Sequence, residues 1–168
     1  MNPGFEVVYQ ENGVGGALYS VRFEGEEKSE LDKFLENSTV QASKEFDCFV
    51  ARLEDMVDSF GFKEHFFKNR EGSIRDSLAA LHYDNGPLRL YCLRWSSVLL
   101  IAGSGGIKRT RTYQDDGVLR EAAEKLQRVD ELILARQKSR EIVIDATTGI
   151  IEGNLIFTSD AYDHDIIA

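Results

Sequence analysis

The chain has 168 residues, 42% of them hydrophobic and 29% charged, and only two prolines. This composition excludes a disordered or collagen-like chain and predicts a single globular domain over 1–168. The net charge of −9 argues against indiscriminate binding to nucleic acid, because that binding depends on cations that neutralise phosphates. The longest apolar run, 98–102, is too short to cross a bilayer and no secretion signal follows Met1, so we expect a cytoplasmic protein without membrane contact.

The charge is unevenly distributed along the chain. Residues 61–120 contain ten Lys and Arg against six Asp and Glu, whereas the remainder contains ten against 23. Such a difference within one domain predicts a local surface that faces anions. Solvated charge runs that pair with the many acids remain the alternative.

The cysteines and histidines do not have metal-ligand spacing. Cys48 and Cys92 lie within apolar runs, which predicts two buried free thiols. His65, His82 and His164 form no metal motif, so we expect no metal and no cofactor.

Two motifs of small-molecule enzymes are also missing. The glycine-rich segment 103–108 follows an apolar strand but lacks the Gly-x-x-x-x-Gly-Lys-Ser/Thr spacing of a phosphate loop. The chain has no Gly-x-Ser-x-Gly elbow for a nucleophilic hydrolase. Nucleotide hydrolysis and nucleophilic hydrolysis are therefore disfavoured.

The first third of the chain predicts a hairpin and a short helix. Residues 6–9 and 17–23 alternate polar and apolar side chains, and the glycines of 11–16 favour the positive φ of a tight turn. This pattern predicts a β-hairpin at about 5–24. Ser29 is the expected N-cap of a short helix, which a polar break at Asn37-Ser38 ends.

A second helix has the clearest pattern in the chain. Ser43 is its expected N-cap, and Gly61 follows it as a C-terminal glycine. Its apolar residues recur at intervals of three and four and share one face: Phe46, Phe49, Val50, Leu53, Met56, Val57 and Phe60. A face this wide predicts core packing rather than a cofactor site.

Three β-segments are predicted after the turn Asn85-Gly86. The strand 88–95 alternates, with Arg89, Tyr91, Leu93 and Trp95 on one face and Leu88, Leu90, Cys92 and Arg94 on the other. Segment 98–102 is apolar on both faces and predicts a central strand. Glycines at 103–106 predict a turn or bulge before the cationic segment 107–112.

A long amphipathic helix and a final hairpin complete the chain. Asp115-Asp116-Gly117 starts the helix, which continues to about Gln137. Its expected buried face contains Leu119, Ala122, Leu126, Val129, Leu132 and Ile133. Segments 141–145 and 154–157 predict a hairpin at about 141–158. We therefore expect an α+β fold: a small antiparallel sheet with two helices before it and one long helix after it, plus an added hairpin at each terminus.

Cations interleave with aromatic rings over the predicted strands. Single-stranded RNA is bound by such sets, because bases stack on rings while phosphates contact the charges. RNA cleavage by its own 2′-hydroxyl needs a base, a cation and an acid but no metal. Lys or Tyr with a shifted pKa, beside Arg, fills those roles where histidine is absent.

One stretch resembles a known family. The apolar strand 98–102, the run Ile107-Lys108-Arg109-Thr110-Arg111-Thr112 and the following amphipathic helix resemble the RelE/HigB/ParE superfamily of bacterial toxins, particularly its phage-derived HigB-like branch. Members of that branch carry an apolar strand, a Lys-Lys-Thr-x-Lys-Thr run and a helix. Residues 86–94 are similar to the strand that forms the floor of the toxins' active cleft. The resemblance covers about 44–135.

The resemblance implies a RelE-like fold and a toxin of a toxin-antitoxin system. Such a toxin is a metal-independent, ribosome-dependent endoribonuclease that cuts messenger RNA. Its partners would be the ribosome, messenger RNA and an antitoxin, a helix-turn-helix protein from a neighbouring gene. The resemblance matches Arg89 to the cleft arginine of these toxins, and Lys108, Arg109 and Arg111 to their basic run. Tyr113 matches no fixed family position but is a ring that could stack on a base or act as the general base. The candidate catalytic residues are therefore Arg89, Lys108, Arg111 and Tyr113, and the candidate RNA-binding residues are Lys68, Arg70, Tyr91, Arg94 and Arg109.

Two other functions remain open. The chain is alternatively a non-catalytic member of the superfamily that binds an antitoxin, a gyrase-like target or a phage partner through its sheet. It is also a candidate phage structural or accessory protein that uses the domain as a scaffold. The nuclease alone requires Arg89 and its neighbouring cations to meet in one solvent-facing hollow.

Overall fold

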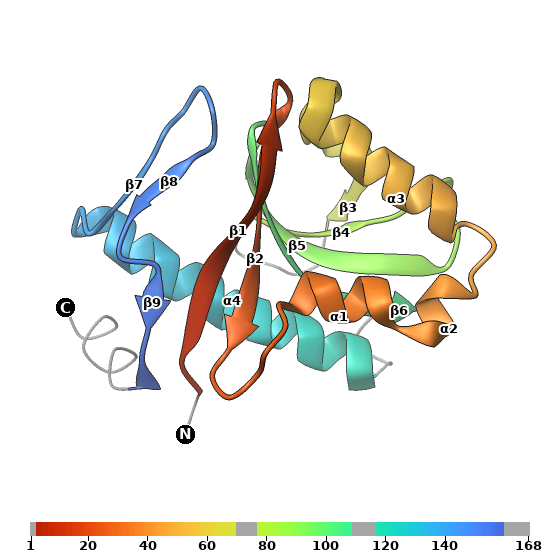
Figure 1. The fold of residues 1–168 in the computed structure, drawn as a ribbon, viewed down its shortest axis with the longest axis horizontal. Coiled ribbons are helices and arrows are strands. Elements are labelled where there is room, and N and C mark those ends of the chain that lie inside the picture. The colour runs from red at the N-terminus through yellow and green to blue at the C-terminus, as the bar shows by residue number, and fades with distance from the viewer. Residues whose placement is uncertain (1–2, 70–76, 109–116, 160–168) are drawn as a thin grey trace.

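The computed structural model describes residues 3–69, 77–108 and 117–159, which form an α+β fold (Figure 1). This class confirms the α+β prediction. The sheet, however, is larger than expected and mixed rather than antiparallel. Its seven strands, over the described residues, have the order β3-β4-β5-β6-β2-β1-β9. They are β1 (Phe5–Gly13), β2 (Gly16–Phe23), β3 (Phe67–Asn69), β4 (Leu78–Leu81), β5 (Leu88–Ser96), β6 (Leu99–Ile107) and β9 (Ile156–Phe157).

The mixed character of the sheet arises from one strand pair. β2 runs parallel to β6, from the pair Ala17 and Leu99 to the pair Ser20 and Ala102. A parallel pair needs a long crossover, and the helices between β2 and β3 supply it on one face of the sheet. The prediction of a purely antiparallel sheet is therefore wrong, because local alternation does not reveal which strands become neighbours.

The predicted N-terminal hairpin is present but has a different place in the fold. β1 and β2 pair antiparallel from Phe5 opposite Phe23 to Gly13 opposite Gly16. Because β2 lies between β1 and β6, the hairpin is an integral part of the sheet rather than an addition to it. Two further strands, β3 and β4, were not predicted, and both are short.

Short helices cover the face of the sheet on the side of the crossover. α1 (Glu30–Glu36) begins at the predicted cap, where the hydroxyl of Ser29 accepts from the N–H of Asp32. A helix that was not predicted follows, α2 (Ser38–Gln41), and the Asn37 side chain caps it by accepting from the Val40 N–H. The polar break at Asn37-Ser38 is thus a helix start, which fits the preference of Asn for N-caps.

The second predicted helix is divided into two parts. α3 (Phe46–Asp55) follows Glu45 rather than Ser43, and a π-helical turn, η1 (Met56–Phe60), continues it to Gly61. Gly61 has φ 77°, which confirms its role as the terminating glycine. Phe60 is 53% exposed, because the wider π-turn rotates it away from the face that the 3.6-residue period predicts.

The glycines after the apolar strand do not end it. β6 continues through them to Ile107, and a bulge places Gly103 and Ser104 opposite Tyr91. A side chain at Gly105 would meet the Arg89 carbonyl oxygen at 1.9 Å, so this strand pair needs glycine there. Of the two predicted alternatives, the bulge is confirmed and the turn is wrong.

The opposite face of the sheet is covered by α4 (Gly117–Lys138), which crosses behind β1 and β2 in Figure 1. The six residues of its predicted inner face are all buried. They pack with Tyr91, Leu93 and Ile101 in one core, whereas Leu90, Cys92 and Leu100 pack with α1 and α3 in a second core. The predicted alternation of strand 88–95 is therefore confirmed.

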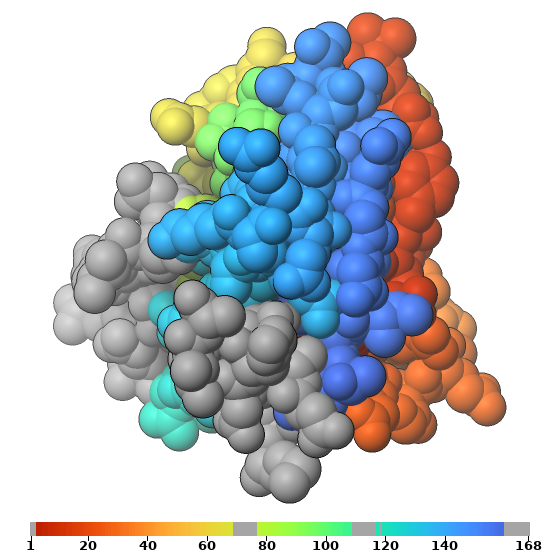
Figure 2. Space-filling model, turned by 90° about the vertical axis from the view of Figure 1, so that its left-hand side faces the viewer, coloured from red at the N-terminus to blue at the C-terminus, as the bar shows by residue number. Residues whose placement is uncertain are grey.

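The C-terminal strands pair differently from the prediction. β7 (Ile142–Ile144) pairs with β8 (Ile151–Gly153), whereas β9 crosses to the main sheet and pairs with Phe5 and Glu6 of β1. Figure 2 shows these C-terminal strands, in blue, against the red β1. The predicted pairing of 141–145 with 154–157 is wrong, because a tight turn after Asp145 brings 151–153 back first.

Two further predictions concern the cysteines and the membrane. Both cysteines are free, but only Cys92 is buried; Cys48 lies on the exposed side of α3, so its predicted burial is wrong. Among the helices of the described residues, none combines the length and the apolar character that crossing a bilayer requires.

Candidate functional site

Three of the predicted cations come together at one end of the sheet. Lys68 pairs with Ala80 across β3 and β4, and Ala80 pairs with Tyr91 across β4 and β5, so Lys68 lies on the α4 face. Arg89 precedes Tyr91 by two residues and has the same orientation. Lys108 follows β6 and donates its backbone N–H to Pro87. We call these three residues, together with His82, the basic cluster.

The electrostatics show that the basic cluster is a region of concentrated positive charge. Partial burial lowers the pKa of Lys68, and the nearby charges of Arg89 and Lys108 lower it further. Among the described residues, Lys68, Arg89 and Lys108 form no ion pair with a carboxylate. Their mutual repulsion is therefore not relieved by an ion pair within the described part of the chain, although Glu45 acts on Arg89 with the opposite charge.

His82 is the member of this cluster that sequence reasoning missed. Burial, and then the charges of Arg89, Lys68 and Arg52, lower its pKa to about 4, so the imidazole is neutral near pH 7. Its Nδ1 atom is buried and has no hydrogen-bond partner in the described part of the chain. The available signal was its position immediately after the apolar segment 78–81, before the turn that leads to Arg89.

Arg89 is held by the backbone and is not displayed on the surface, so the expectation that it faces solvent together with the neighbouring cations is wrong. It is 5% exposed, and its Nη1 donates to the carbonyl oxygens of Gly86 and, at 3.1 Å, of Leu88. Burial lowers its pKa below that of a solvated guanidinium, whereas Tyr91 and Glu45 act in the opposite direction. The guanidinium therefore holds the turn before β5 and contributes charge to the cluster from beneath.

Two other predicted RNA-binding residues, Tyr91 and Arg94, are not part of the basic cluster's exposed surface. Tyr91 is 3% exposed and packs in the core beneath α4. Arg94 points to the other face, where its Nε donates to the Phe62 carbonyl at 2.5 Å and its Nη1 is 3.8 Å from Glu64. The structure thus brings Lys68, Arg89 and Lys108 together and separates Arg94 from them.

The remaining predicted site residues lie outside the described residues. They are Arg70, Arg109, Arg111 and Tyr113. Two of them, Arg109 and Arg111, come shortly after Lys108 in the sequence.

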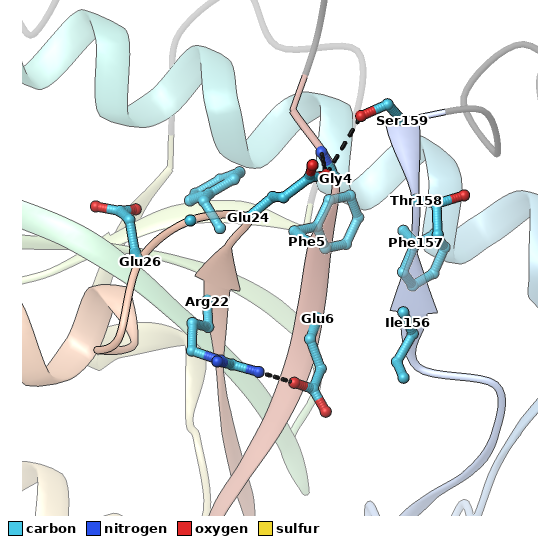
Figure 3. A pocket seen from close by; sticks show the side chains of 12 residues that line it. Gly4, Phe5, Glu6, Arg22, Glu24, Glu26, Ile156, Phe157, Thr158 and Ser159 are labelled. Carbon is cyan, nitrogen blue, oxygen red and sulfur yellow. Dashed lines mark hydrogen bonds and ion pairs between the residues drawn. The ribbon is translucent and has the colours of Figure 1, made fainter.

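A pocket of about 540 Å³ lies at the other edge of the sheet, between β1, β2 and β9 (Figure 3). Most of its charged side chains are paired within it: Arg22 with Glu6, and Glu24 with the Gly4 N–H and the Ser159 hydroxyl. Phe5 and Phe157 stack at 4.5 Å beside them. None of the predicted site residues lines this pocket, and its internal pairing fits a structural role in joining β9 to the sheet.

The basic cluster can bind a polyanion through its ammonium groups. Lys68 is exposed and Lys108 is half-buried, so both can reach a phosphate, while Arg89 adds charge from within. Over the described residues, no group of three His, Cys, Asp or Glu side chains is placed to hold a metal ion. No protein-family model, curated protein or solved structure matches the chain.

Proposed function

We propose that the chain is a toxin of the RelE/HigB/ParE type, which binds RNA at the basic cluster and cleaves it without a metal. The observation that carries this proposal is the meeting of Lys68 on β3, Arg89 on β5 and Lys108 directly after β6, without an ion-pair partner among the described residues. The order of helices α1 and α3, strands β4 to β6 and helix α4 is consistent with it.

The cluster contains groups suited to each step of the cleavage. The 2′-oxygen attacks phosphorus and loses its proton, the P–O5′ bond breaks, and the 5′-oxygen takes up a proton. Neutral His82 is a proton acceptor, and Lys68, with its lowered pKa, is a stronger acid than a solvated lysine. Arg89 and Lys108 stabilise the negative charge that develops on the phosphate. Arg111 remains a proposed participant on the grounds of the family resemblance, and Tyr113 as an aromatic ring close to the basic run in the sequence.

The toxin would act with the partners that the resemblance implies. Messenger RNA on the ribosome is the substrate, and a helix-turn-helix antitoxin from a neighbouring gene neutralises the toxin in the cytoplasm. The acidic remainder of the molecule restricts RNA to the basic cluster, since acidic surfaces repel phosphates.

A second function is favoured by one observation. Arg89 and Tyr91 are 5% and 3% exposed, so one candidate catalytic residue and one candidate RNA-binding residue lie in the interior. A non-catalytic member of the superfamily, which binds a protein partner through its sheet, would need neither side chain at the surface.

Paired charge variants test the nuclease. Lys68→Gln with Lys108→Gln removes two cations from the cluster, and Lys28→Gln with Lys138→Gln removes two exposed cations elsewhere. The measurements are growth on expression, cleavage of messenger RNA with ribosomes, and binding of a labelled single-stranded RNA at several salt concentrations. We expect the cluster variant to lose arrest and cleavage and to bind RNA at least about tenfold more weakly.

The salt dependence of binding provides an internal check. The slope of log affinity against log salt should decrease by about 0.7 for each phosphate that the cluster variant no longer neutralises, and the control variant should match the parent. Equal toxicity of the two double variants would overturn the site. A parent chain that neither binds nor cleaves RNA would leave the protein-binding module as the better function.

A further inference from the structure

A groove of about 200 Å³ lies on the other face of the sheet, between α1 and α3. Its floor consists of Leu18, Leu31 and Leu53, each at most 4% exposed. The half-buried Leu35 and Val50 form its walls. We call it the acidic groove; its lining residues are Gln10, Glu11, Leu18, Leu31, Leu35, Val50, Leu53 and Glu54.

Carboxylates lie at the edge of this apolar floor, and no ion pair of the described residues neutralises their negative charge. Burial raises the pKa of Glu11, and the charges of Asp58 and Glu54 raise it further. None of these three carboxylates forms an ion pair within the described part of the chain. The carboxylate of Glu11 is therefore in an environment that a cation from outside would stabilise.

The cations of the neighbouring helices are engaged elsewhere. Lys33 on α1 pairs with Glu26 and Glu30. Arg52 on α3 lies over the rings of Phe66 and Tyr83, at 4.6 and 4.7 Å from their centroids. Lys33 and Arg52 are therefore not paired with the carboxylates of Glu11 and Glu54.

The groove also adjoins an open strand edge. β9 covers the outer edge of β1 only at Phe5 and Glu6, and Leu155 accepts from the N–H of Val7. From Val8 to Gly13, that edge pairs with no other strand of the described residues. Gln10 and Glu11 of this unpaired stretch line the groove, so a segment bound there lies next to a strand edge that has no strand partner within the described residues.

We propose that the acidic groove docks a short basic segment of a partner protein. The segment inserts one bulky apolar side chain over Leu18, Leu31 and Leu53 and places Lys or Arg beside Glu11 and Glu54. The volume is suited to a single large side chain, because drug-sized ligands occupy pockets of roughly 300–1,000 Å³. The carboxylates exclude nucleic acid, so the groove and the basic cluster bind ligands of opposite charge on opposite faces.

Selection from a displayed library of random 12-residue peptides tests the docking site. The full chain is the bait, and the selected peptides are synthesised and titrated by fluorescence anisotropy. We expect them to share one Leu, Ile or Phe close to at least two Lys or Arg. Glu11→Gln with Glu54→Gln, and separately Leu35→Ser, should each weaken binding at least tenfold.

The control removes two carboxylates from the opposite face. Glu121→Gln with Glu124→Gln on α4 should leave peptide affinity unchanged. Selected peptides without basic residues, equal binding to the groove and control variants, or no enrichment would each overturn the proposal. So would a dimer of the free chain that Leu35→Ser dissociates in sedimentation, since the occupant would then be a second copy. The chain with a bound peptide should bind the labelled RNA as tightly as the free chain does. Failure of the docking proposal can therefore be distinguished from failure of the nuclease proposal.

Discussion

The basic cluster and the acidic groove are two regions where like charges meet without an ion-pair partner among the described residues. They lie on opposite faces of the sheet and at opposite ends of β6: Leu18 in the groove pairs with Leu100 near its start, whereas Lys108 follows its end. In the basic cluster, Arg89 donates to backbone carbonyls and the Lys108 N–H donates to Pro87. In the acidic groove, carboxylates lie at the edge of a floor of leucines. A net charge of −9 therefore conceals two local fields of opposite sign, which the sheet keeps apart.

The same physical causes act in both regions. Burial, followed by like charges, lowers the pKa of Lys68 and raises the pKa of Glu11. Each shift disfavours the charged form, so each region would be stabilised by a ligand of the opposite charge. This symmetry connects the RNA proposal with the docking proposal, although either can fail alone.

The largest expected effect distinguishes buried from exposed cations within the cluster. Arg89→Ala should lower the free energy of unfolding by about 2–4 kcal/mol, because it removes buried packing and the donor for the Gly86 and Leu88 carbonyls. Lys68→Ala should change it by no more than about 0.5 kcal/mol. Urea unfolding followed by circular dichroism measures both, and similar losses would contradict the assignment of Arg89 as the internal cation.

An intermediate effect concerns His82 and pH. Its folded pKa of about 4 lies below the unfolded value of 6.5, so the unfolded chain binds the proton more readily. The stability that neutral His82 contributes is complete above pH 6.5 and is lost as pH falls towards 4. The parent should lose more stability over this range than His82→Gln, on the order of 1 kcal/mol after solvent screening.

A titration of His82 sharpens the same comparison. Nuclear magnetic resonance should show a midpoint near 4, which rises when inorganic phosphate or single-stranded RNA binds the cluster. A His82 ring that titrates at its ordinary pKa in the free protein would show that it is neither buried nor close to Lys68 and Arg89, and so is not a member of the cluster.

The smallest effect is expected at the acidic groove. The folded pKa of Glu11 is raised, so its charged form costs stability above that pKa, and the cost disappears as pH falls below the unfolded 4.5. Glu11→Gln should therefore be more stable than the parent at pH 7 by a few tenths of a kcal/mol, as is typical of exposed charges. Thermal melts at pH 7 and pH 4 measure the difference. A variant that is less stable than the parent at pH 7 would show that Asp58 and Glu54 do not destabilise the charged form of Glu11.

Local periodicity predicted several elements correctly. The hairpin of β1 and β2, the alternation of β5 and the buried face of α4 follow from side-chain spacing over a few neighbouring residues. The pattern failed where an interaction between distant segments decided the outcome. Gly105 lies within a strand rather than a turn, where its lack of a side chain lets the Arg89 carbonyl of β5 approach closely. β9 pairs with β1 although about 150 residues separate Glu6 from Ile156.

The candidate site shows the same limit. The amino-acid types and their spacing were sufficient to indicate a cationic region on the predicted strands that includes Arg89 and Lys108. Lys68 was a candidate as well, but the strand β3 that brings it beside them was not predicted. His82 was missed because its neutral state depends on Arg89, Lys68 and Arg52, which come from separate segments. The opposite directions of Tyr91 and Arg94 followed from alternation, but their burial required the packing of α4 and of the segment around Phe62.

The sequence by itself determined which residues share a face of a helix or strand, because those periods arise from backbone geometry within a few residues. Only the tertiary structure decided which strands are neighbours, which cations are buried, and where like charges meet. These outcomes depend on contacts between segments that are far apart in the chain, and burial and pKa are properties of the whole set of neighbours around a group.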